Sequence, residues 1–211
     1  MEQKIQLYSL ATPNGQKVSI ALEEMNLPYD AHTINILKGD QFTDEFIAIN
    51  PNSKIPAIVD SGHAVFESGA ILIYLAQKSG MFLPKDPLNY SKVMQWLFFQ
   101  VGGVGPMFGQ FGHFFKYAKD KCDHPYPIKR YTDETKRLLA VVNEQLKKNE
   151  FIAGPEITIA DFATMPWIVC LDKFYQASTQ LELESFNYVN NWVKNLLSRP
   201  RIQKGMNVCQ I

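Results

Sequence analysis

The sequence has no excess of charge of either sign, because 21 Lys and Arg residues balance 21 Asp and Glu residues. A balanced chain gives no indication of a nucleic-acid or membrane partner, since both attract basic proteins. We therefore expect neither nucleic acid nor membrane among its partners. With 211 residues, 46% of them hydrophobic, the chain has enough material for one large domain or two small ones.

Cysteine is also scarce. The three thiols, Cys122, Cys170 and Cys209, form no CxxC pair and cannot all pair with one another. This usage is typical of a reducing compartment and excludes a disulfide framework. The first residues lack the basic start and the apolar run of a secretory signal. The sequence therefore predicts a cytoplasmic location.

Several motifs of common active sites are missing. No two histidines stand at i, i+4, so we expect no metal site. The glycines of GGVGPMFG do not have the GxGxxG spacing of a dinucleotide-binding loop, and no GK[ST] of a phosphate-binding loop follows them. Close packing between helices explains these glycines better than a nucleotide-binding site does. No GxSxG is present for a hydrolase nucleophile. The scattered histidines are His32, His63, His113 and His124.

One long run has no charged residue. Residues 93–115 contain no Lys, Arg, Asp or Glu, and the run is long enough to span a bilayer of ~30 Å. However, it holds five Gly, three Gln and Pro106, which a membrane helix would not favour. We interpret the run as a buried helix that is interrupted near Gly105 and Pro106.

The first 80 residues alternate between strand and helix periods. Ser61 and Gly62 separate two short apolar runs, which predicts a tight β-hairpin. The predicted order is strand, helix, strand, helix, two strands and helix. The strands are expected at 5–8, 29–36, 57–60 and 64–66, and the helices at 18–25, 44–49 and 68–80.

The remaining residues follow a different pattern. Residues 81–90 contain two prolines and are expected to form a linker. Apolar residues then recur every three or four positions along 128–146 and along 186–196, which predicts helices. We therefore expect an α/β domain over 1–80 and an all-helical domain over 91–211.

The tetrapeptide TIAD predicts a helix start within the second half. Thr158 suits the N-cap and Asp161 the third helical position, which makes a variant of the capping box. Ile157 and Phe162 suit the hydrophobic staple around that cap. We therefore assign Asp161 a structural role and no catalytic one.

The stretch SLATPNG lies between the first strand and the first helix, where α/β proteins often place reactive groups. It has no Cys, His or acid, so the candidates are the polar side chains of Ser9, Thr12 and Asn14, with Tyr8 just before the stretch. Turn formation and helix capping explain the same residues. Likewise, Pro56 suits the start of a strand, and Ser68 suits either a helix N-cap or an anion site.

Together these features resemble the cytosolic glutathione transferase superfamily over essentially the whole chain, and within it the nu-class (Ure2-like) bacterial enzymes. The resemblance implies an α/β thioredoxin-like N-terminal domain, a second helical domain that forms a second-substrate pocket, glutathione as cosubstrate, and a homodimer. It is carried by TPNG, KGDQF, NPNSKIPAIVD, FESGAILIYLA, WLFFQVGGVGPMFGQ and RYTDET.

The resemblance also assigns site residues. Thr12 and Asn14 match positions beside the glutathione sulfur and would be catalytic, with Asn14 also binding. The cis peptide bond expected at Pro56 would follow the residue whose main chain pairs with the cysteinyl part. The binding residues are Gln41 and Lys54 at the glycyl end, Ile55 at the cysteinyl part, Glu67 and Ser68 at the γ-glutamyl group, and Arg130 from the second domain, in its own or the partner subunit.

A turn without cysteine must obtain its thiol from elsewhere. A thiol ionises near pH ~8.5, and a helix N-terminus with nearby donors lowers that value. One hydrogen bond to a charged group contributes about 1.5–3 kcal/mol, roughly one to two pKa units. Thr12 and Asn14 would thus make bound glutathione a thiolate. Tyr8 and Ser9 resemble the catalytic Tyr or Ser of other transferase classes, but the motif TPNG implies that the role of the hydroxyl has moved to Thr12.

We expect this thiolate to reduce small-molecule disulfides, with conjugation of electrophiles and peroxide reduction as weaker activities. Two alternatives stay open: a conventional transferase that conjugates electrophiles, and a non-catalytic glutathione-binding or regulatory protein. The long Asn/Gln-rich tail of the yeast prion relative is not in this sequence. Either apolar pocket lining or core packing explains Phe108, Phe111, Phe114 and Phe115.

Overall fold

A computed structural model describes residues 4–211, which form two compact units. The N-terminal unit extends to Pro84 and also includes 197–211, and the helical unit comprises 85–196. The sequence analysis instead placed all of 91–211 in the helical domain. The two divisions differ at the C-terminus because the last helix packs against the first one, and the boundaries at 80 and 90 stay a prediction.

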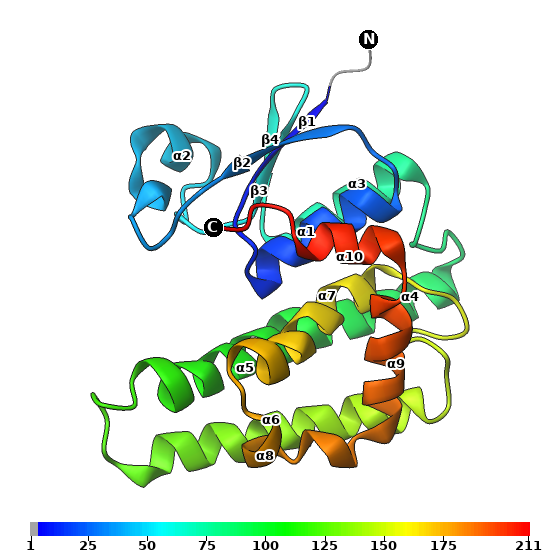
Figure 1. The fold of residues 1–211 in the computed structure, drawn as a ribbon. Coiled ribbons are helices and arrows are strands. Elements are labelled where there is room, and N and C mark those ends of the chain that lie inside the picture. Colours follow the sequence, from blue (N-terminus) through cyan, green and yellow to red (C-terminus); the bar gives the residue numbers. More distant parts are fainter. Residues whose placement is uncertain (1–3) are drawn as a thin grey trace. The chain divides into compact units, whose positions relative to one another are not determined.

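A four-stranded mixed sheet forms the centre of the N-terminal unit, in the order β2-β1-β3-β4 (Figure 1). Strand β1 (Ile5–Ser9) pairs in parallel with β2 (Tyr29–Thr33) and antiparallel with β3 (Ala57–Asp60). Strand β4 (His63–Phe66) completes the hairpin with β3. The strands and helices follow one another along the chain in the predicted order, and the sheet confirms the thioredoxin-like fold.

Helices α1 and α3 lie side by side, and α10 packs along α1 (Figure 1). Their inner residues close the core of this unit; Val18, Ala21 and Leu72, for example, are fully buried. The helices of the unit are α1 (Pro13–Glu24), the 3₁₀ turn η1 (Asp40–Phe42), α2 (Asp44–Ile49), α3 (Ser68–Ser79) and α10 (Pro200–Met206).

Two turns show how local chemistry sets the strand ends. At Ser61 and Gly62 both φ angles are positive, 52° and 82°, as a two-residue type I′ hairpin requires. Strand β2 ends at Thr33, three residues earlier than predicted. The reason is Asn35, whose N–H donates to Asp40 Oδ2 at 2.9 Å and whose Oδ1 accepts the Leu37 N–H at 3.0 Å, so the chain turns there.

Gly205 allows α10 to approach α1 closely. The Ser19 hydroxyl donates to the Gly205 carbonyl at 2.7 Å, and a Cβ at Gly205 would lie 2.6 Å from Ile20 Cα. We expect Gly205→Ala to lower the free energy of unfolding by about 1–3 kcal/mol, because backbone atoms cannot yield as side chains do. Urea unfolding measures this, and Gly102→Ala, with no atom within 4 Å of its Cβ, is the control. Equal stabilities of the two variants would contradict the close approach.

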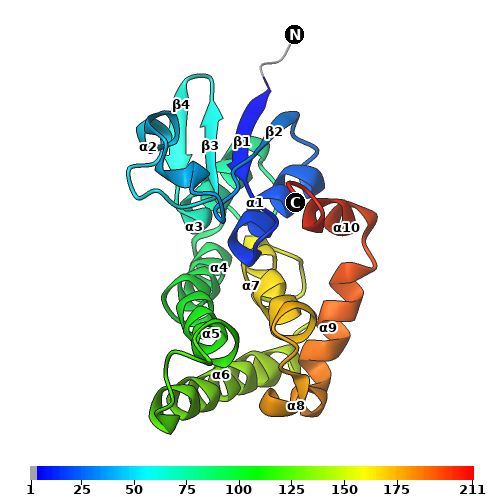
Figure 2. The same cartoon turned by 60° about the vertical axis from the view of Figure 1, so that its left-hand side comes forward.

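The helical unit consists of helices joined by loops (Figure 2). Some helical segments continue into wider π turns. Within it α5 packs against α6, and α4 packs against α7. Its α-helices are α4 (Pro87–Phe99), α5 (Gly105–Gly112), α6 (Pro125–Leu146), α7 (Ile159–Val169), α8 (Ser178–Leu181) and α9 (Asn187–Leu197). Its π segments are η2 (Gln100–Val104), η3 (His113–Tyr117) and η4 (Cys170–Phe174), and η5 (Leu183–Ser185) is 3₁₀.

The uncharged run forms an interrupted helix, as predicted. The α-helical pattern gives way to a π turn at Gln100–Val104 and resumes at Gly105, with Pro106 near the start of α5, where its missing N–H is not needed. Gly112 lies against the Tyr175 ring, so small residues serve close packing here. In residues 4–211, no helix combines the length and the apolar character that crossing a membrane requires.

Candidate active site at the start of helix α1

One end of the sheet gathers three segments that the sequence analysis singled out. Tyr8 pairs with Ala57, and Ala57 pairs with Phe66 on the next antiparallel strand. Three segments therefore lie at the same end of the sheet: the turn after β1, the peptide before β3 and the start of α3 after β4. Most of the predicted site residues lie on these segments.

Thr12 is the N-cap of α1. Its Oγ1 accepts the Gly15 N–H at 3.5 Å, and Pro13 and Asn14 are the first two helical residues. The cap uses a lone pair of the hydroxyl and leaves its hydrogen for another acceptor. Capping and donation to an anion, which the sequence presented as alternatives, are therefore compatible at Thr12. Both Thr12 and Asn14 are half-buried.

Gly15 fixes how tightly this turn closes. A Cβ at Gly15 would lie 2.0 Å from the Leu10 carbonyl oxygen and 2.5 Å from Ser9 Oγ. Only glycine lets the first turn of α1 fold back against the end of β1. The motif TPNG thus places the N-terminus of α1 directly after the strand.

Ser9 and Tyr8 are engaged within the fold. Ser9 is buried, and its hydroxyl lies 3.4 Å from the Leu10 carbonyl, to which it donates. The Tyr8 ring stacks on His32 with a centroid distance of 4.7 Å. These contacts leave Thr12 and Asn14 as the polar side chains at the helix start itself.

The loop before β3 is organised by a buried asparagine. Asn50 donates from Nδ2 to the Lys54 carbonyl at 2.6 Å, and its Oδ1 accepts the Asn52 N–H at 2.9 Å. The Ile55–Pro56 peptide bond that follows is cis, as the resemblance implied. Lys54 is exposed and Ile55 is half-buried, so the loop presents a cationic side chain and a stretch of main chain.

Gln41 carries a buried acceptor with no donor. Its Nε2 donates to the Ile36 carbonyl at 3.4 Å, whereas its Oε1 is buried and finds no donor among residues 4–211. An unpaired buried acceptor costs about 1–3 kcal/mol. A ligand N–H would satisfy this oxygen, which fits the predicted binding role.

Glu67, and not Ser68, is the N-cap of α3. Ser68 is the first helical residue, so the prediction that Ser68 caps this helix is wrong. Glu67 is exposed with φ of +68°, a backbone region that non-glycine residues rarely adopt and that is more frequent at functional sites. This conformation places an acidic side chain beside the N–H groups that begin α3.

Lys17 is a site residue that the sequence analysis missed. Its side chain is only 2% exposed, and its Nζ lies 3.2 Å from Ser68 Oγ. Burial lowers the pKa of Lys17 to about 7, while the nearby charge of Glu67 acts in the opposite direction. The only sequence signal was position: Lys17 follows Asn14 by three residues, so both lie on one face of α1.

The buried ammonium of Lys17 lowers the folding stability by an amount that depends on pH. The pKa of Lys17 is near 7 in the folded chain and near 10.5 when exposed, so the unfolded chain binds more protons between these values. Folding stability due to this group therefore rises with pH from about 7 to about 10. We expect Lys17→Met to be more stable than the parent at pH 7, with the difference shrinking toward pH 10. Urea unfolding across this range measures it, and a constant difference would contradict it.

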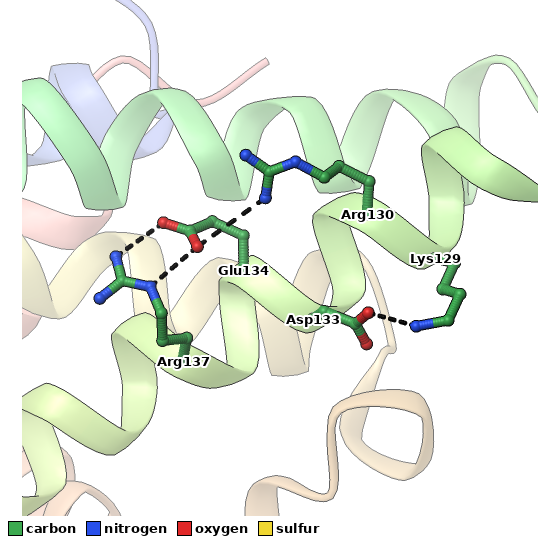
Figure 3. Close-up of polar contacts among 5 residues, drawn as sticks. All are labelled: Lys129, Arg130, Asp133, Glu134 and Arg137. Atoms are coloured by element: carbon green, nitrogen blue, oxygen red, sulfur yellow. Dashed lines mark hydrogen bonds and ion pairs between the residues drawn. The ribbon is translucent and has the colours of Figure 1, made fainter.

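Arg130 lies on α6 of the helical unit (Figure 3). Its guanidinium is 3.9 Å from Glu134, but Glu134 accepts two shorter hydrogen bonds, of 2.8 and 2.7 Å, from Arg137. Arg130 is half-exposed and has no stronger partner within the described chain, residues 4–211. Its predicted role in binding stays a prediction.

The four phenylalanines of the uncharged run divide into two pairs. Phe108 and Phe111 are fully buried, so core packing accounts for them. Phe114 and Phe115 line a cavity of about 560 Å³ within the helical unit, together with Lys119, His124 and Tyr175. The apolar lining that the sequence suggested therefore involves only the second pair.

The combined arrangement suits an anion that is held by hydrogen-bond donors and helix ends. Helices α1 and α3 begin at the same end of the sheet. The side-chain donors of Thr12, Asn14 and Ser68 lie at these two helix N-termini. Helix N-termini favour negative charge, including a thiolate or carboxylate. Among residues 4–211, no group of three or more His, Cys, Asp or Glu side chains is arranged to hold a metal.

Family models match both units of the chain. Residues 11–78 match the glutathione S-transferase N-terminal domain, and residues 104–200 match the glutathione S-transferase C-terminal domain. A curated relative, the disulfide-bond oxidoreductase YghU of Escherichia coli K12, is 47% identical over 213 residues. That alignment covers 95% of this chain and 73% of the relative.

Solved structures of similar chains contain glutathione. A glutathione transferase family member from Pseudomonas fluorescens, with two glutathiones bound, is 47% identical with a TM-score of 0.95, covering 97% of this chain and 93% of that one. A glutathione transferase from Pseudomonas putida binds one glutathione disulfide per subunit. It is 45% identical with a TM-score of 0.93, covering 97% of this chain and 91% of that one.

Proposed function

We propose that this chain, which belongs to the glutathione S-transferase family, is a glutathione-dependent disulfide-bond reductase that uses the thiolate of bound glutathione. The predicted family and the predicted enzyme class, a glutathione transferase-like oxidoreductase, are confirmed by the matches to both family domains and by the relative named a disulfide-bond oxidoreductase. The reductase activity of this chain, its residue roles and its second substrate are our proposal.

The observation that carries the proposal is a helix start with donors but no thiol. Thr12 and Asn14 stand where a redox protein of this fold would need cysteines. Burial raises the pKa of Cys170 to about 11 and also raises that of Cys209, so both thiols stay protonated at neutral pH. None of the three cysteines lies on the turn that begins α1, so we propose that glutathione supplies the reacting sulfur.

The reaction proceeds by two exchanges. The glutathione thiolate attacks one sulfur of a small-molecule disulfide, a new S–S bond forms, and the other sulfur leaves as a thiolate that takes up a proton. A second glutathione thiolate then attacks this mixed disulfide, releasing the second thiol and glutathione disulfide. The two glutathiones supply both electrons, so no protein cysteine and no metal are required.

Each binding residue has a role in this proposal. Glu67 pairs with the γ-glutamyl ammonium, and Ser68 with the N–H groups of α3 holds its carboxylate. The main chain of Ile55 pairs with the cysteinyl part, while Gln41 and Lys54 bind the glycyl end. Arg130 assists from the helical domain. We further propose a cytoplasmic homodimer whose helical domain forms the second-substrate pocket.

The testing experiment compares two reactions. Hydroxyethyl disulfide reduction, coupled to glutathione reductase and NADPH, reports the reductase, and chlorodinitrobenzene conjugation reports a conventional transferase. We expect the first to dominate, with weak conjugation and weak peroxide reduction. Dominant conjugation would instead indicate an ordinary transferase, and background rates with measurable glutathione binding would indicate a binding or regulatory protein.

Removal of the protein's own thiols should leave the activity intact. We expect a variant with Cys122→Ser, Cys170→Ala and Cys209→Ser to retain at least half of the reductase activity, because none of these sulfurs takes part. Alanine at Cys170 avoids a new buried hydroxyl at a site that is 8% exposed. If the activity falls to background while the fold is kept, a protein cysteine is the nucleophile and the proposal is wrong.

A further inference from the structure

We propose that Lys17 is a positioning residue for the γ-glutamyl carboxylate of glutathione: from beneath α3, its ammonium directs the Ser68 hydroxyl and adds positive charge at the helix start. This inference rests on the proposed function, since it concerns the same glutathione site. It assigns a role to a residue on α1 that the resemblance did not include.

The first step is the burial of the lysine. Lys17 is 2% exposed and lies on the face of α1 that packs beside α3. A buried lysine is destabilising unless it has partners, and a methionine would fill the same space without that cost. A buried ammonium at this place is therefore better explained by what it does for a neighbour than by packing.

The second step is the direction of one hydrogen bond. An ammonium has three donors and no acceptor, so in the contact at 3.2 Å the Ser68 oxygen must accept. The hydrogen of the Ser68 hydroxyl then points away from Lys17. Because Ser68 is the first residue of α3, that hydrogen joins the unpaired N–H groups of the helix start, toward any anion bound there.

The third step is charge. Glu67, the N-cap of α3, is the charged side chain whose field acts on Lys17, and it is the predicted partner of the ligand's ammonium. A bound zwitterionic γ-glutamyl group brings a cation to Glu67 and an anion to Ser68. The anion near Lys17 favours its charged form, so binding should be accompanied by proton uptake at pH values where free Lys17 is partly neutral.

The test uses binding rather than turnover, with a ligand that has no thiol. S-methylglutathione cannot form a thiolate, so titration calorimetry in two buffers of different ionisation enthalpy reports only other protons. Near pH 8 we expect more proton uptake with the parent chain than with Lys17→Met, because the ligand's own amine takes up protons beside Glu67 in both chains. We also expect Lys17→Met to bind about tenfold more weakly, the lower range for a lost hydrogen bond to a charged group.

Matched ligands and variants separate positioning from general damage. An S-methylated analogue with γ-aminobutyrate in place of the γ-glutamyl residue lacks the carboxylate, and its affinity should change less than twofold in Lys17→Met. Ser68→Ala should weaken binding of S-methylglutathione, and the double variant should lose less than the product of the two single losses. Lys4→Met, which removes an exposed lysine paired with Asp30, is the control and should bind like the parent.

The outcomes also distinguish the two proposals. If the parent chain binds S-methylglutathione and reduces disulfides, but Lys17→Met binds within twofold and takes up the same protons, the role of Lys17 is overturned and the proposed function stands. Equal losses for both ligands would also overturn it, because they would indicate general damage. If the parent chain binds no S-methylglutathione, the glutathione site itself is wrong and both proposals fall.

Discussion

Asn14→Ala is expected to lower kcat/KM for glutathione-dependent disulfide reduction by about 10- to 100-fold. In the proposed site the Asn14 amide donates a hydrogen bond to the glutathione thiolate, and a hydrogen bond to a charged group contributes roughly 1.5–3 kcal/mol. Without it the pKa of the bound thiol rises by roughly one to two units, so less thiolate is present at neutral pH. The pH profile of kcat/KM should shift upward by the same amount, which steady-state assays from pH 6 to pH 10 measure.

Thr12 provides the matched control for this prediction. Thr12→Ala should also slow the reaction, but it removes the N-cap of α1 and with it about 1 kcal/mol of stability. Thr12→Ser keeps the hydroxyl and should restore both activity and stability. If Asn14→Ala retains full activity with an unshifted pH profile, the amide does not stabilise the thiolate, and the helix N-terminus alone must do so.

The sequence predicted those parts of the fold that depend on neighbours in the chain. Ser61 and Gly62 indicated their hairpin because a two-residue turn has a local chemistry. Thr158 and Asp161 indicated their helix start for the same reason. The residues predicted to bind glutathione, by contrast, came from the family resemblance, since Asn14 or Gln41 alone has no distinctive pattern.

The sequence could not reveal features that depend on packing between distant segments. Lys17 resembles an ordinary surface lysine until α3 is placed beside α1. The C-terminal helix α10 was assigned to the helical domain because it follows other helices, yet Gly205 brings it against Ile20. Ser68 was taken as a possible cap because serine favours that position, whereas the backbone of Glu67 turns one residue earlier.

Asp161→Ala is expected to cause the largest loss of stability. Asp161 is fully buried, and its carboxylate accepts four hydrogen bonds from three parts of the helical unit. The donors are the Ile152 N–H at 3.0 Å, the Thr158 N–H at 2.8 Å, the Thr158 hydroxyl at 3.1 Å and Trp192 Nε1 at 3.0 Å. Removal of the acceptor leaves these donors buried and unpaired. Each unpaired donor lowers the free energy of unfolding by about 1–3 kcal/mol before the structure relaxes. We expect a net loss of at least about 3 kcal/mol in urea unfolding.

Asp161→Asn tests whether the geometry or only the size of the side chain matters. Its amide nitrogen would face donors instead of accepting from them, so it should recover little of the lost stability. Burial raises the pKa of Asp161 to about 6 despite the four donors, so the stability due to this carboxyl falls as the pH rises from about 4 to about 6. The parent should therefore exceed Asp161→Asn in free energy of unfolding by more at pH 4 than at pH 7.

Asp133→Asn is the control, because Asp133 forms an exposed ion pair with Lys129; it should lower the free energy of unfolding by under about 1 kcal/mol. If Asp161→Asn and Asp133→Asn lose the same stability, the hydrogen bonds of Asp161 to Ile152 in the preceding loop and to Trp192 on α9 do not stabilise the helical unit.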